Sequence, residues 1–314
     1  MTDRAAITTC YDRIRSRVRR TPVMDVEAGG LGFDHPVTLK LEHLQRTGSF
    51  KLRGAFNNML AADLPEAGVV AISGGNHGAA VALAATELGA KSAVFVPGQI
   101  AIEVKLERMR RFGAEVIVTE GNVDQAVMAF QDHAERTGAL AVHPYGSVET
   151  ITGQGSVGLE TEDQAPDLDT LFVAVGGGGL IGGIASWYQG RTKIVAVETE
   201  GTNALDRTLK GTLKPDFRVS GISASGLGAT SIGDLPMEII RAHVAENIVV
   251  SDADVFEAQR RLWSSTRMVA EPGGVTALAA LTSGAYVPEK GEKIGVVICG
   301  GNADPDWFLQ EGAA

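Results

Sequence analysis

Short apolar runs alternate with helix-like runs along almost the whole chain, and this alternation is the feature that most restricts the fold. In the first half, apolar runs occur at 68–72, 92–96, 114–119 and 140–143. In the second half, similar runs occur at 170–175, 193–198, 247–251 and 293–300. Strands that alternate with helices predict βαβ units and a parallel sheet. Because the runs lack polar alternation, they fit strands that are buried on both faces.

The length of the chain indicates that these units form more than one lobe. A chain of 314 residues, 44% of them hydrophobic, is long enough for two α/β lobes. We therefore expect an α/β fold with two open, mostly parallel sheets in two lobes. We expect a small mobile domain at 68–146 and a large domain made of 1–63 and 147–314. The region 211–235 is rich in glycine and serine, and we interpret it as an extended connection.

The charge balance and the cysteines argue against several classes of protein. The chain has 28 Lys+Arg against 38 Asp+Glu, a net charge of −10, whereas nucleic-acid binders usually carry a basic face. We interpret the basic run 13–20 as a solvated helix face. Cys10 and Cys299 have no metal-ligand spacing, so we expect a reduced, cytoplasmic protein. The uncharged stretches 67–86 and 170–190 contain glycine clusters, and we expect no membrane span.

Three of the expected strands end in glycine-rich loops, namely SGGNHG at 73–78, GGGGLIGG at 176–183 and CGGN at 299–302. Ligands of open α/β sheets bind beyond the carboxyl ends of the strands, so we expect these loops to border one cleft. The run Gly176–Gly179 follows a strand and opens a helix. Backbone N–H groups and the helix dipole favour an anion at such a position, and a phosphate is the natural ligand.

The same loop fits a second interpretation. Gly177, Gly179 and Gly182 match the dinucleotide pattern G-x-G-x-x-G. Glu198 ends the next expected strand about 20 residues on, where a ribose-binding acid would lie. A nicotinamide-dependent oxidoreductase therefore stays open on this motif alone, because the pattern reports only close approach of the backbone to a phosphate.

The segment TGSFKLRGA at 47–55 contains the most distinctive lysine of the chain. Lys51 lies between Phe50 and Leu52, with Arg53 nearby and few acids around it. Apolar and cationic neighbours disfavour the ammonium form, and a neutral amine can form an imine with an aldehyde. Most lysines are solvated surface residues, however, so the segment needs further support.

Four motifs in order supply that support. LEHLQRTGSFKLRGA at 41–55 resembles a Schiff-base lysine segment, and SGGNHG resembles a loop that binds the substrate carboxylate. GGGGLIGG resembles a phosphate cup, and CGGN resembles a segment that faces a pyridine nitrogen. Over nearly its whole length, the chain thus resembles the fold-type II pyridoxal-phosphate enzymes, which share the tryptophan synthase β-like fold. Within them it resembles the threonine/serine dehydratase and serine racemase branch.

The resemblance implies a role for each matching residue. Lys51 would bond to pyridoxal 5′-phosphate and then move protons at the substrate α-carbon, as the catalytic residue. The large domain would bind the cofactor, and the cofactor-binding residues would be Phe50, Lys51, Gly176, Gly177, Gly178, Gly179, Leu180 and Cys299 of that domain together with Asn76 of the small domain. The small domain would hold the substrate carboxylate with Ser73, Gly74, Gly75, Asn76 and His77. The resemblance further implies an amino-acid substrate and a homodimer.

Cys299 indicates which reaction follows. A thiol is a weak, neutral partner for the ring nitrogen, so the ring becomes a poorer electron sink than one paired with a carboxylate. This favours rapid loss of a β-leaving group, and we expect an ammonia-lyase that converts a small L-β-hydroxy amino acid, such as threonine or serine, to a 2-keto acid and ammonia.

Departures from the family pattern define the alternatives. Racemases of this branch carry a serine where this chain has Gly74, and glycine cannot donate a proton from the opposite face. Members with a cation site place an acid where this chain has Ala204, six residues after Glu198, so we expect no metal there. The atypical segments 145–149 and 223–226 border the expected substrate site. They leave a hydroxyaspartate or a phenylserine open as substrate, and the role of Glu271 is also open.

Overall fold

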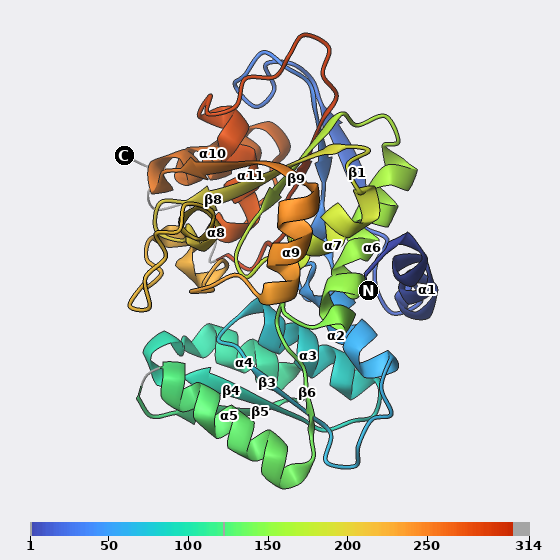
Figure 1. Ribbon diagram of the computed structural model, residues 1–314, viewed down its shortest axis with the longest axis vertical. Coiled ribbons are helices and arrows are strands. Elements are labelled where there is room, and N and C mark those ends of the chain that lie inside the picture. The colour runs from blue at the N-terminus through green and yellow to red at the C-terminus, as the bar shows by residue number, and fades with distance from the viewer. Residues whose placement is uncertain (1, 122, 304–314) are drawn as a thin grey trace.

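The computed structural model describes residues 2–121 and 123–303, and its strands form two sheets in two lobes. Figure 1 shows the two lobes one above the other along the long axis of the molecule. The larger sheet has the strand order β1-β2-β10-β7-β8-β9 and the smaller sheet has the order β5-β4-β3-β6. The expected α/β fold with two mostly parallel sheets is confirmed.

The small lobe contains a wholly parallel sheet of β3 (Val69–Ile72), β4 (Ser92–Pro97), β5 (Glu115–Thr119) and β6 (Leu140–Ala141). Its helices are α3 (Asn76–Glu87), α4 (Glu103–Arg111) and α5 (Val123–Thr137), with a 3₁₀ turn at Gly98–Ile100. Side chains of β4 alternate between the two faces: Val94 and Val96 pack in a cluster with α3 and α4, whereas Ala93 and Phe95 pack in a cluster with α5. The sheet is therefore covered on both faces.

The sheet of the large lobe consists of β1 (Val23–Val26), β2 (Val37–Lys40), β7 (Thr170–Ala174), β8 (Lys193–Thr199), β9 (Val244–Val250) and β10 (Ile294–Val297). Only β1 and β2 pair antiparallel; the other pairs are parallel. The sequence did not predict β1 and β2. Residues 210–233 contain no strand and only a 3₁₀ turn at Ile222–Ser225, in agreement with the extended connection expected there.

The helices of the large lobe are α1 (Arg4–Ile14), α2 (Lys51–Leu60), α6 (Val148–Gln164), α7 (Gly179–Tyr188), α8 (Ala204–Leu209), α9 (Asp234–His243), α10 (Asp252–Thr266) and α11 (Pro272–Thr282), with a 3₁₀ turn at Glu42–Leu44. In Figure 1, α2 lies where the two lobes meet. The prediction that 13–20 forms a solvated helix face was wrong about the helix beyond Ile14, where α1 ends, although most of the arginines of this run are exposed. The chain then turns to bring Val18 into the core, and Arg19 and Arg20 are exposed.

A buried cluster of charges fixes α2 to the large lobe. Arg53 is fully buried and donates to Glu42 and Glu160, with distances of 2.7–2.9 Å. Lys40 is also buried and donates to Glu160 at 2.8 Å. The cluster thus contains two cations and two carboxylates. Pairing is what makes such burial tolerable, since an isolated buried charge costs several kcal/mol.

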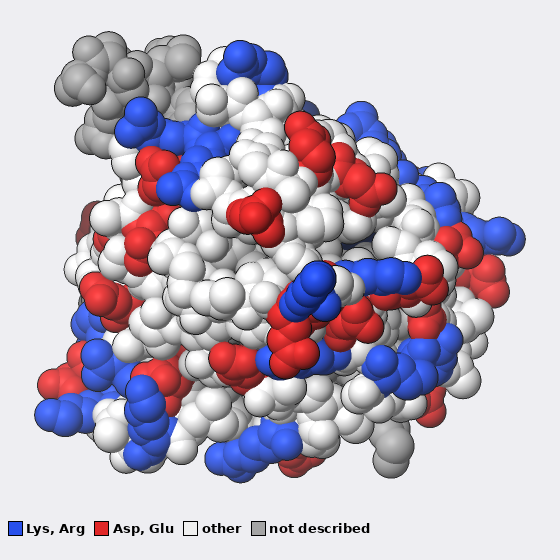
Figure 2. Space-filling model, turned by 90° about the horizontal axis from the view of Figure 1, so that it is seen from above, with Lys and Arg blue, Asp and Glu red and all other residues white. Residues whose placement is uncertain are grey.

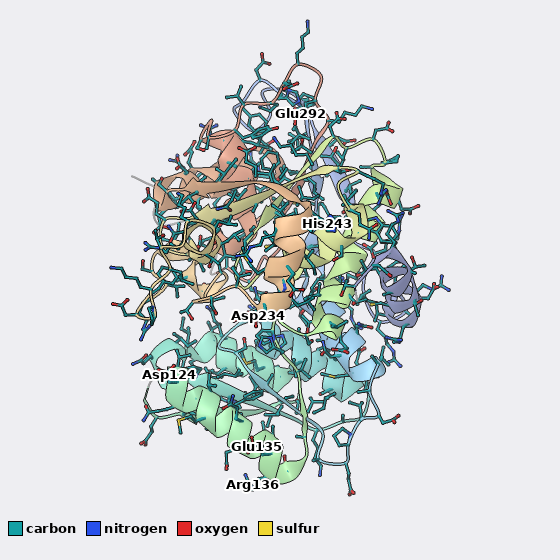
Figure 3. All side chains as sticks on the ribbon, in the orientation of Figure 1. Asp124, Glu135, Arg136, Asp234, His243 and Glu292 are labelled. Atoms are coloured by element: carbon teal, nitrogen blue, oxygen red, sulfur yellow. The ribbon has the colours of Figure 1, made fainter. Side chains whose placement is uncertain are left out.

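The surface carries interspersed charges on the parts that the figures display. Figure 2, which looks down on the end of the large lobe, shows Lys and Arg close to Asp and Glu rather than gathered in one patch. In Figure 3, Asp124, Glu135 and Arg136 of α5 lie along the outer side of the small lobe, and all are exposed. Among the described residues, no helix is both long enough and apolar enough to cross a lipid bilayer.

Candidate active site

Lys51 is the first residue of α2, and the segment before it is tied to the C-terminal end of β10. The Phe50 N–H donates to the Cys299 carbonyl at 3.2 Å, and the Gly301 N–H donates to the Gly48 carbonyl at 2.9 Å. Gly48 has φ +77°, which favours glycine, and an added Cβ would lie 2.2 Å from Oδ1 of Asn302. Two motifs that are 250 residues apart, LEHLQRTGSFKLRGA and CGGN, therefore form one structural unit.

The environment of Lys51 disfavours its charged form. Nζ donates to the Pro144 carbonyl at 2.8 Å and lies 5.1 Å from the centre of the Phe50 ring. No described carboxylate lies within ion-pair distance of Nζ. Burial lowers the pKa of Lys51 from 10.5 to about 8, and the Cys299 thiol opposes this shift only in part. The amine is therefore neutral in a useful fraction of molecules near neutral pH.

The SGGNHG loop connects β3 to α3 and presents backbone N–H groups. The Gly75 N–H donates to the Ser73 hydroxyl at 3.1 Å, which shapes the turn. Because α3 begins at Asn76, its first N–H groups have no partner within the helix and point toward the loop. A carboxylate is a natural ligand at such a helix start. The loop that the sequence predicts to bind a carboxylate therefore lies at this helix start, and it contains Ser73, Gly74, Gly75 and Asn76.

His77 lies in the same loop, but its ring points elsewhere. The ring Nε2–H donates to the Val142 carbonyl at 2.9 Å, and the side chain is buried. Burial and the nearby charge of Lys51 lower the pKa of His77 to about 3. The ring is therefore neutral and holds α3 against the end of β6. Only the backbone N–H of His77 is left for a carboxylate.

A polar network joins the carboxylate loop to the large lobe. Asn76 Nδ2 donates to Glu271, and Asn76 Oδ1 accepts from Asn302 Nδ2 at 2.6 Å. Burial raises the pKa of Glu271, although Asn76, Lys105 and Arg108 each lower it in part. Lys105 and Arg108 of α4 line a small cavity beside this network. Because an amide nitrogen has two hydrogens, Asn76 keeps one for a further acceptor.

The position of Gly74 bears on the number of proton-transfer groups. A Cβ at Gly74 would lie 2.9 Å from Cδ1 of Ile100. Ile100 is 49% exposed, so its side-chain end can move. The loop therefore has neither a hydroxyl at this position nor a rigid obstacle to one.

The glycine loop lies between β7 and α7. Gly178 has φ +90° and precedes α7, so Gly179 and Leu180 offer N–H groups at the helix start. A Cβ at Gly177 would lie 2.3 Å from Cγ of Tyr145, and one at Gly179 would lie 2.9 Å from the Tyr145 Cα. Gly176 similarly faces the Leu227 backbone at 3.2 Å. A side chain at any of these three positions would meet Tyr145 or Leu227, so glycine allows these two residues to pack against the loop.

Cys299 lies two residues after the end of β10, the strand next to β7, and it is buried. Its Sγ donates to the Gly273 carbonyl at 3.4 Å, and burial raises the pKa of the thiol. The group is therefore a neutral thiol. The sequence predicts that Cys299 makes a weak, neutral contact with the ring nitrogen of the cofactor, and this contact stays a prediction.

Glu198 does not take part in this site. Its carboxylate accepts the N–H groups of Leu205 and Asp206, each at 2.8 Å, at the start of α8. Burial raises its pKa to about 7. Within the described residues, no three His, Cys, Asp or Glu side chains are grouped closely enough to hold a metal ion. The expectation of no metal at Ala204 stays a prediction.

Sequence reasoning missed several contacts that close the site. The Pro144 carbonyl is a backbone group and has no sequence signature. Tyr145 lies in the atypical segment 145–149, and its packing against Gly177 brings that segment beside the glycine loop. The second atypical segment is adjacent to the carboxylate loop, since a Cβ at Gly75 would lie 3.6 Å from the Ser225 carbonyl. Both segments thus border the site.

The arrangement fits a ligand that has an aldehyde and a phosphate. Lys51 supplies an amine with a lowered pKa, and the glycine loop supplies the N–H groups at the start of α7. Asn76 retains a donor for an oxygen, and Phe50 supplies an apolar ring beside the amine. Pyridoxal phosphate has the groups that these residues would bind.

Comparison with known proteins agrees with this fit. The model of the pyridoxal-phosphate dependent enzyme family matches residues 14–300. The chain is 36% identical to L-threonine ammonia-lyase of Thermotoga maritima over 85% of this chain and 67% of that protein. It is 34% identical to phenylserine dehydratase of Ralstonia pickettii over 98% of this chain and 95% of that protein.

Among solved structures, maize serine racemase superposes with a TM-score of 0.91 at 32% identity, covering 99% of this chain and 97% of that chain. The family match replaces the nicotinamide interpretation of Gly177, Gly179 and Gly182. The folded arrangement, the residues around Lys51 and these similarities lead to one conclusion: the chain belongs to the pyridoxal-phosphate dependent enzyme family, and pyridoxal phosphate is its cofactor.

Proposed function

We propose that this chain is a dehydratase-type ammonia-lyase that converts a small L-β-hydroxy amino acid, such as threonine or serine, to a 2-keto acid and ammonia. The observation that carries the proposal is Lys51: its amine has a pKa lowered to about 8 and lies in a site that contains two helix starts, one at the carboxylate loop and one at the glycine loop. Similarity to L-threonine ammonia-lyase of Thermotoga maritima supports it.

In this proposal, each group of site residues binds a different part of the substrate or the cofactor. The N–H groups from Ser73 to His77 hold the substrate carboxylate, and those from Gly176 to Leu180 hold the phosphate. Phe50 would pack against the ring of the cofactor, Asn76 would donate to its phenolic oxygen and Cys299 would face its nitrogen. Lys51 takes the proton from the substrate α-carbon.

When bound, pyridoxal phosphate withdraws electrons from the α-carbon, so that the C–H bond and then the β C–O bond can break. The substrate loses its α-proton and its β-hydroxyl as water. The enamine that leaves the protein takes up one water and releases ammonia, so the net products are one 2-keto acid and one ammonia. The neutral Cys299 thiol favours this elimination over a long-lived carbanion.

Racemisation is the alternative reaction, and the similarity to maize serine racemase supports considering it. Inverting the α-carbon requires a proton donor on the face opposite Lys51. Position 74 is a glycine, so it has no side chain that could donate this proton. Elimination requires a proton-transfer group on one face only, so we favour the dehydratase.

The β-substituent is a finer question. Similarity to phenylserine dehydratase of Ralstonia pickettii extends over 98% of this chain, which supports phenylserine as a second substrate candidate. Tyr145 lies beside the glycine loop and the Ser225 carbonyl lies beside the carboxylate loop, and we propose that a larger β-group would contact them. A hydroxyaspartate is the third candidate.

A panel assay tests the proposal. The purified enzyme with added pyridoxal phosphate is supplied with L-threonine, L-serine, L-phenylserine and β-hydroxyaspartate, and 2-keto acid and ammonia are both quantified. We expect equimolar products from at least one of them, and none from the Lys51→Ala variant. Chiral chromatography of the remaining substrate gives the alternative. D-amino acid that forms faster than keto acid would replace the dehydratase with a racemase.

Three further properties belong to this proposal. We expect a homodimer in the cytoplasm, and a small domain at 68–146 that moves relative to the rest. Sedimentation equilibrium measures the first of these. Hydrogen exchange with and without a substrate analogue measures the motion, and equal protection of 68–146 in both states would argue against it.

A further inference from the structure

Helix α6 lies between the two helices that carry the functional groups. Helix α2 begins with Lys51, and helix α7 begins with Gly179 at the glycine loop. Figure 1 shows α6 beside α7 and reaching down to α2 where the lobes meet. The distance from the lysine to the glycine loop is therefore set by how closely α2 and α7 each approach α6.

The contact between α2 and α6 is a backbone contact. A Cβ added at Gly153 of α6 would lie 2.6 Å from the Gly54 Cα, 2.8 Å from the Arg53 carbonyl oxygen and 2.9 Å from the Gly54 nitrogen. All three atoms belong to the backbone of α2, so no side chain could rotate away. The helices approach each other at a distance that only glycine at position 153 permits.

The contact between α6 and α7 is equally close. A Cβ added at Gly183 of α7 would lie 2.4 Å from the Ile151 carbonyl oxygen and 2.5 Å from the Gly155 nitrogen, both in the backbone of α6. In return, a Cβ added at Gly155 would lie 3.0 Å from the Gly183 carbonyl oxygen, and closer still to the Ile7 side chain. Gly153 and Gly155 are two residues apart, about 200° around the helix, so the two contacts are on opposite sides of α6.

Each contact lies one turn from a functional group. Gly54 is three residues after Lys51, and Gly183 is four residues after Gly179. One turn of helix is rigid, so a shift at the contact moves the functional group by a similar amount. The aldehyde and the phosphate of pyridoxal phosphate are held apart by a planar ring, and their separation cannot adapt.

We propose that Gly153 and Gly183 are positioning residues: α6 acts as a spacer of fixed thickness that matches the lysine and the glycine loop to the length of the cofactor. This inference rests on the proposed role of Lys51. An alanine at Gly183 must separate α6 from α7 by about 1 Å to reach an ordinary contact distance. A displacement of about 1 Å at a reacting group can cost on the order of 100-fold.

Two variants test separately how the protein binds the phosphate end and the aldehyde end of the cofactor. Apo-protein is titrated with pyridoxal phosphate, with pyridoxal, which lacks the phosphate, and with pyridoxamine phosphate, which lacks the aldehyde. For Gly183→Ala we expect at least tenfold weaker binding of both phosphate compounds and less than threefold change for pyridoxal. For Gly153→Ala we expect pyridoxamine phosphate to bind within twofold of wild type, while the borohydride-reducible adduct at Lys51 falls at least fivefold.

Gly158→Ala is the matched control. It lies on the same helix α6, and its Cβ would lie 3.0 Å from the Trp187 Cβ, a side-chain atom of α7 far from the loop. It perturbs the packing of α6 and α7 without displacing either functional end. We expect its thermal midpoint to change and its binding of all three compounds to stay within twofold of wild type.

A second pair keeps the inference testable if Gly153→Ala does not fold. A Cβ at Gly54 would lie 2.5 Å from Nε2 of Gln154, the end of a side chain, and 3.1 Å from the backbone carbonyl oxygen of Thr150. We expect Gly54→Ala to lower the Lys51 adduct. We expect Gly54→Ala combined with Gln154→Ala to restore most of it, because the double variant removes the closer of the two contacts. The inference is wrong if the folded glycine variants bind all three compounds as Gly158→Ala does. If wild type itself forms no adduct at Lys51, the proposed function fails instead.

Discussion

The lowered pKa of Lys51 makes a quantitative prediction about how fast the apo-protein captures its cofactor. Only the neutral amine attacks an aldehyde, so the capture rate follows the neutral fraction of Lys51. With a pKa of about 8, about a quarter of the amine is neutral at pH 7.5, whereas a lysine at 10.5 would be neutral in about one molecule in a thousand. The site therefore raises the reactive fraction by about two orders of magnitude.

The assay is stopped-flow absorbance of apo-protein mixed with pyridoxal phosphate from pH 6 to pH 10. A lowered pKa means that the neutral form is reached at lower pH, so we expect the rate to rise tenfold per pH unit below 7 and to level off near pH 8. Nα-acetyl-lysine, measured in the same buffers, corrects for ionisation of the cofactor. Its rate should continue to rise up to pH 10.

A rate that rises in parallel with that of Nα-acetyl-lysine up to pH 10 would refute the reasoning. It would mean that Lys51 is solvated in the apo-protein, because burial is the main cause of the shift. The contact of Nζ with the Pro144 carbonyl would then be absent in solution.

Three further predictions concern other parts of the structure. Arg53→Met leaves two buried carboxylates with one cation, and we expect a loss of about 3–5 kcal/mol in urea denaturation; a loss below about 1 kcal/mol would mean that the cluster is hydrated. Gly178→Ala introduces a Cβ at φ +90°, and we expect the free energy of unfolding to fall by about 1–3 kcal/mol. Relative to wild type, we expect the affinity for pyridoxal phosphate to fall more than the affinity for pyridoxal; an equal fall for both compounds would count against a phosphate site there. Gly74→Ser adds a hydroxyl beside the movable Ile100 side chain, and we expect interconversion of L- and D-serine by chiral chromatography; its complete absence in a folded variant would show that a serine there is not sufficient.

The sequence predicted the apolar strands of both sheets and missed two short strands, β1 and β2, which lie side by side at one side of the larger sheet. The runs at 68–72, 92–96 and 170–175 became β3, β4 and β7 with shifts of one residue, because apolar runs of that length are typical of parallel strands. Strands β1 and β2 have four residues each, and their sequences VMDV and VTLK include polar residues. Such short segments have too little pattern to be distinguished from loops.

For the site as well, the sequence predicted some features and missed others. Motifs placed Lys51, the carboxylate loop and the glycine loop in one cleft, because each follows the carboxyl end of a parallel strand or adjoins one. Sequence could not place the acceptor of Lys51 or the partner of the His77 ring, since both are backbone carbonyls. Nor could it find the link from Asn76 to Glu271, which depends on how the two lobes meet.

The most direct measurement of the central claim is peptide mass mapping. The holoenzyme is reduced with borohydride, digested and sequenced by tandem mass spectrometry. We expect the reduced cofactor on a single lysine, the one at the start of α2, with its mass added to the peptide that contains SFKLR. Cofactor attached to a different lysine, or absent from every peptide of a protein that still releases keto acid, would contradict the account.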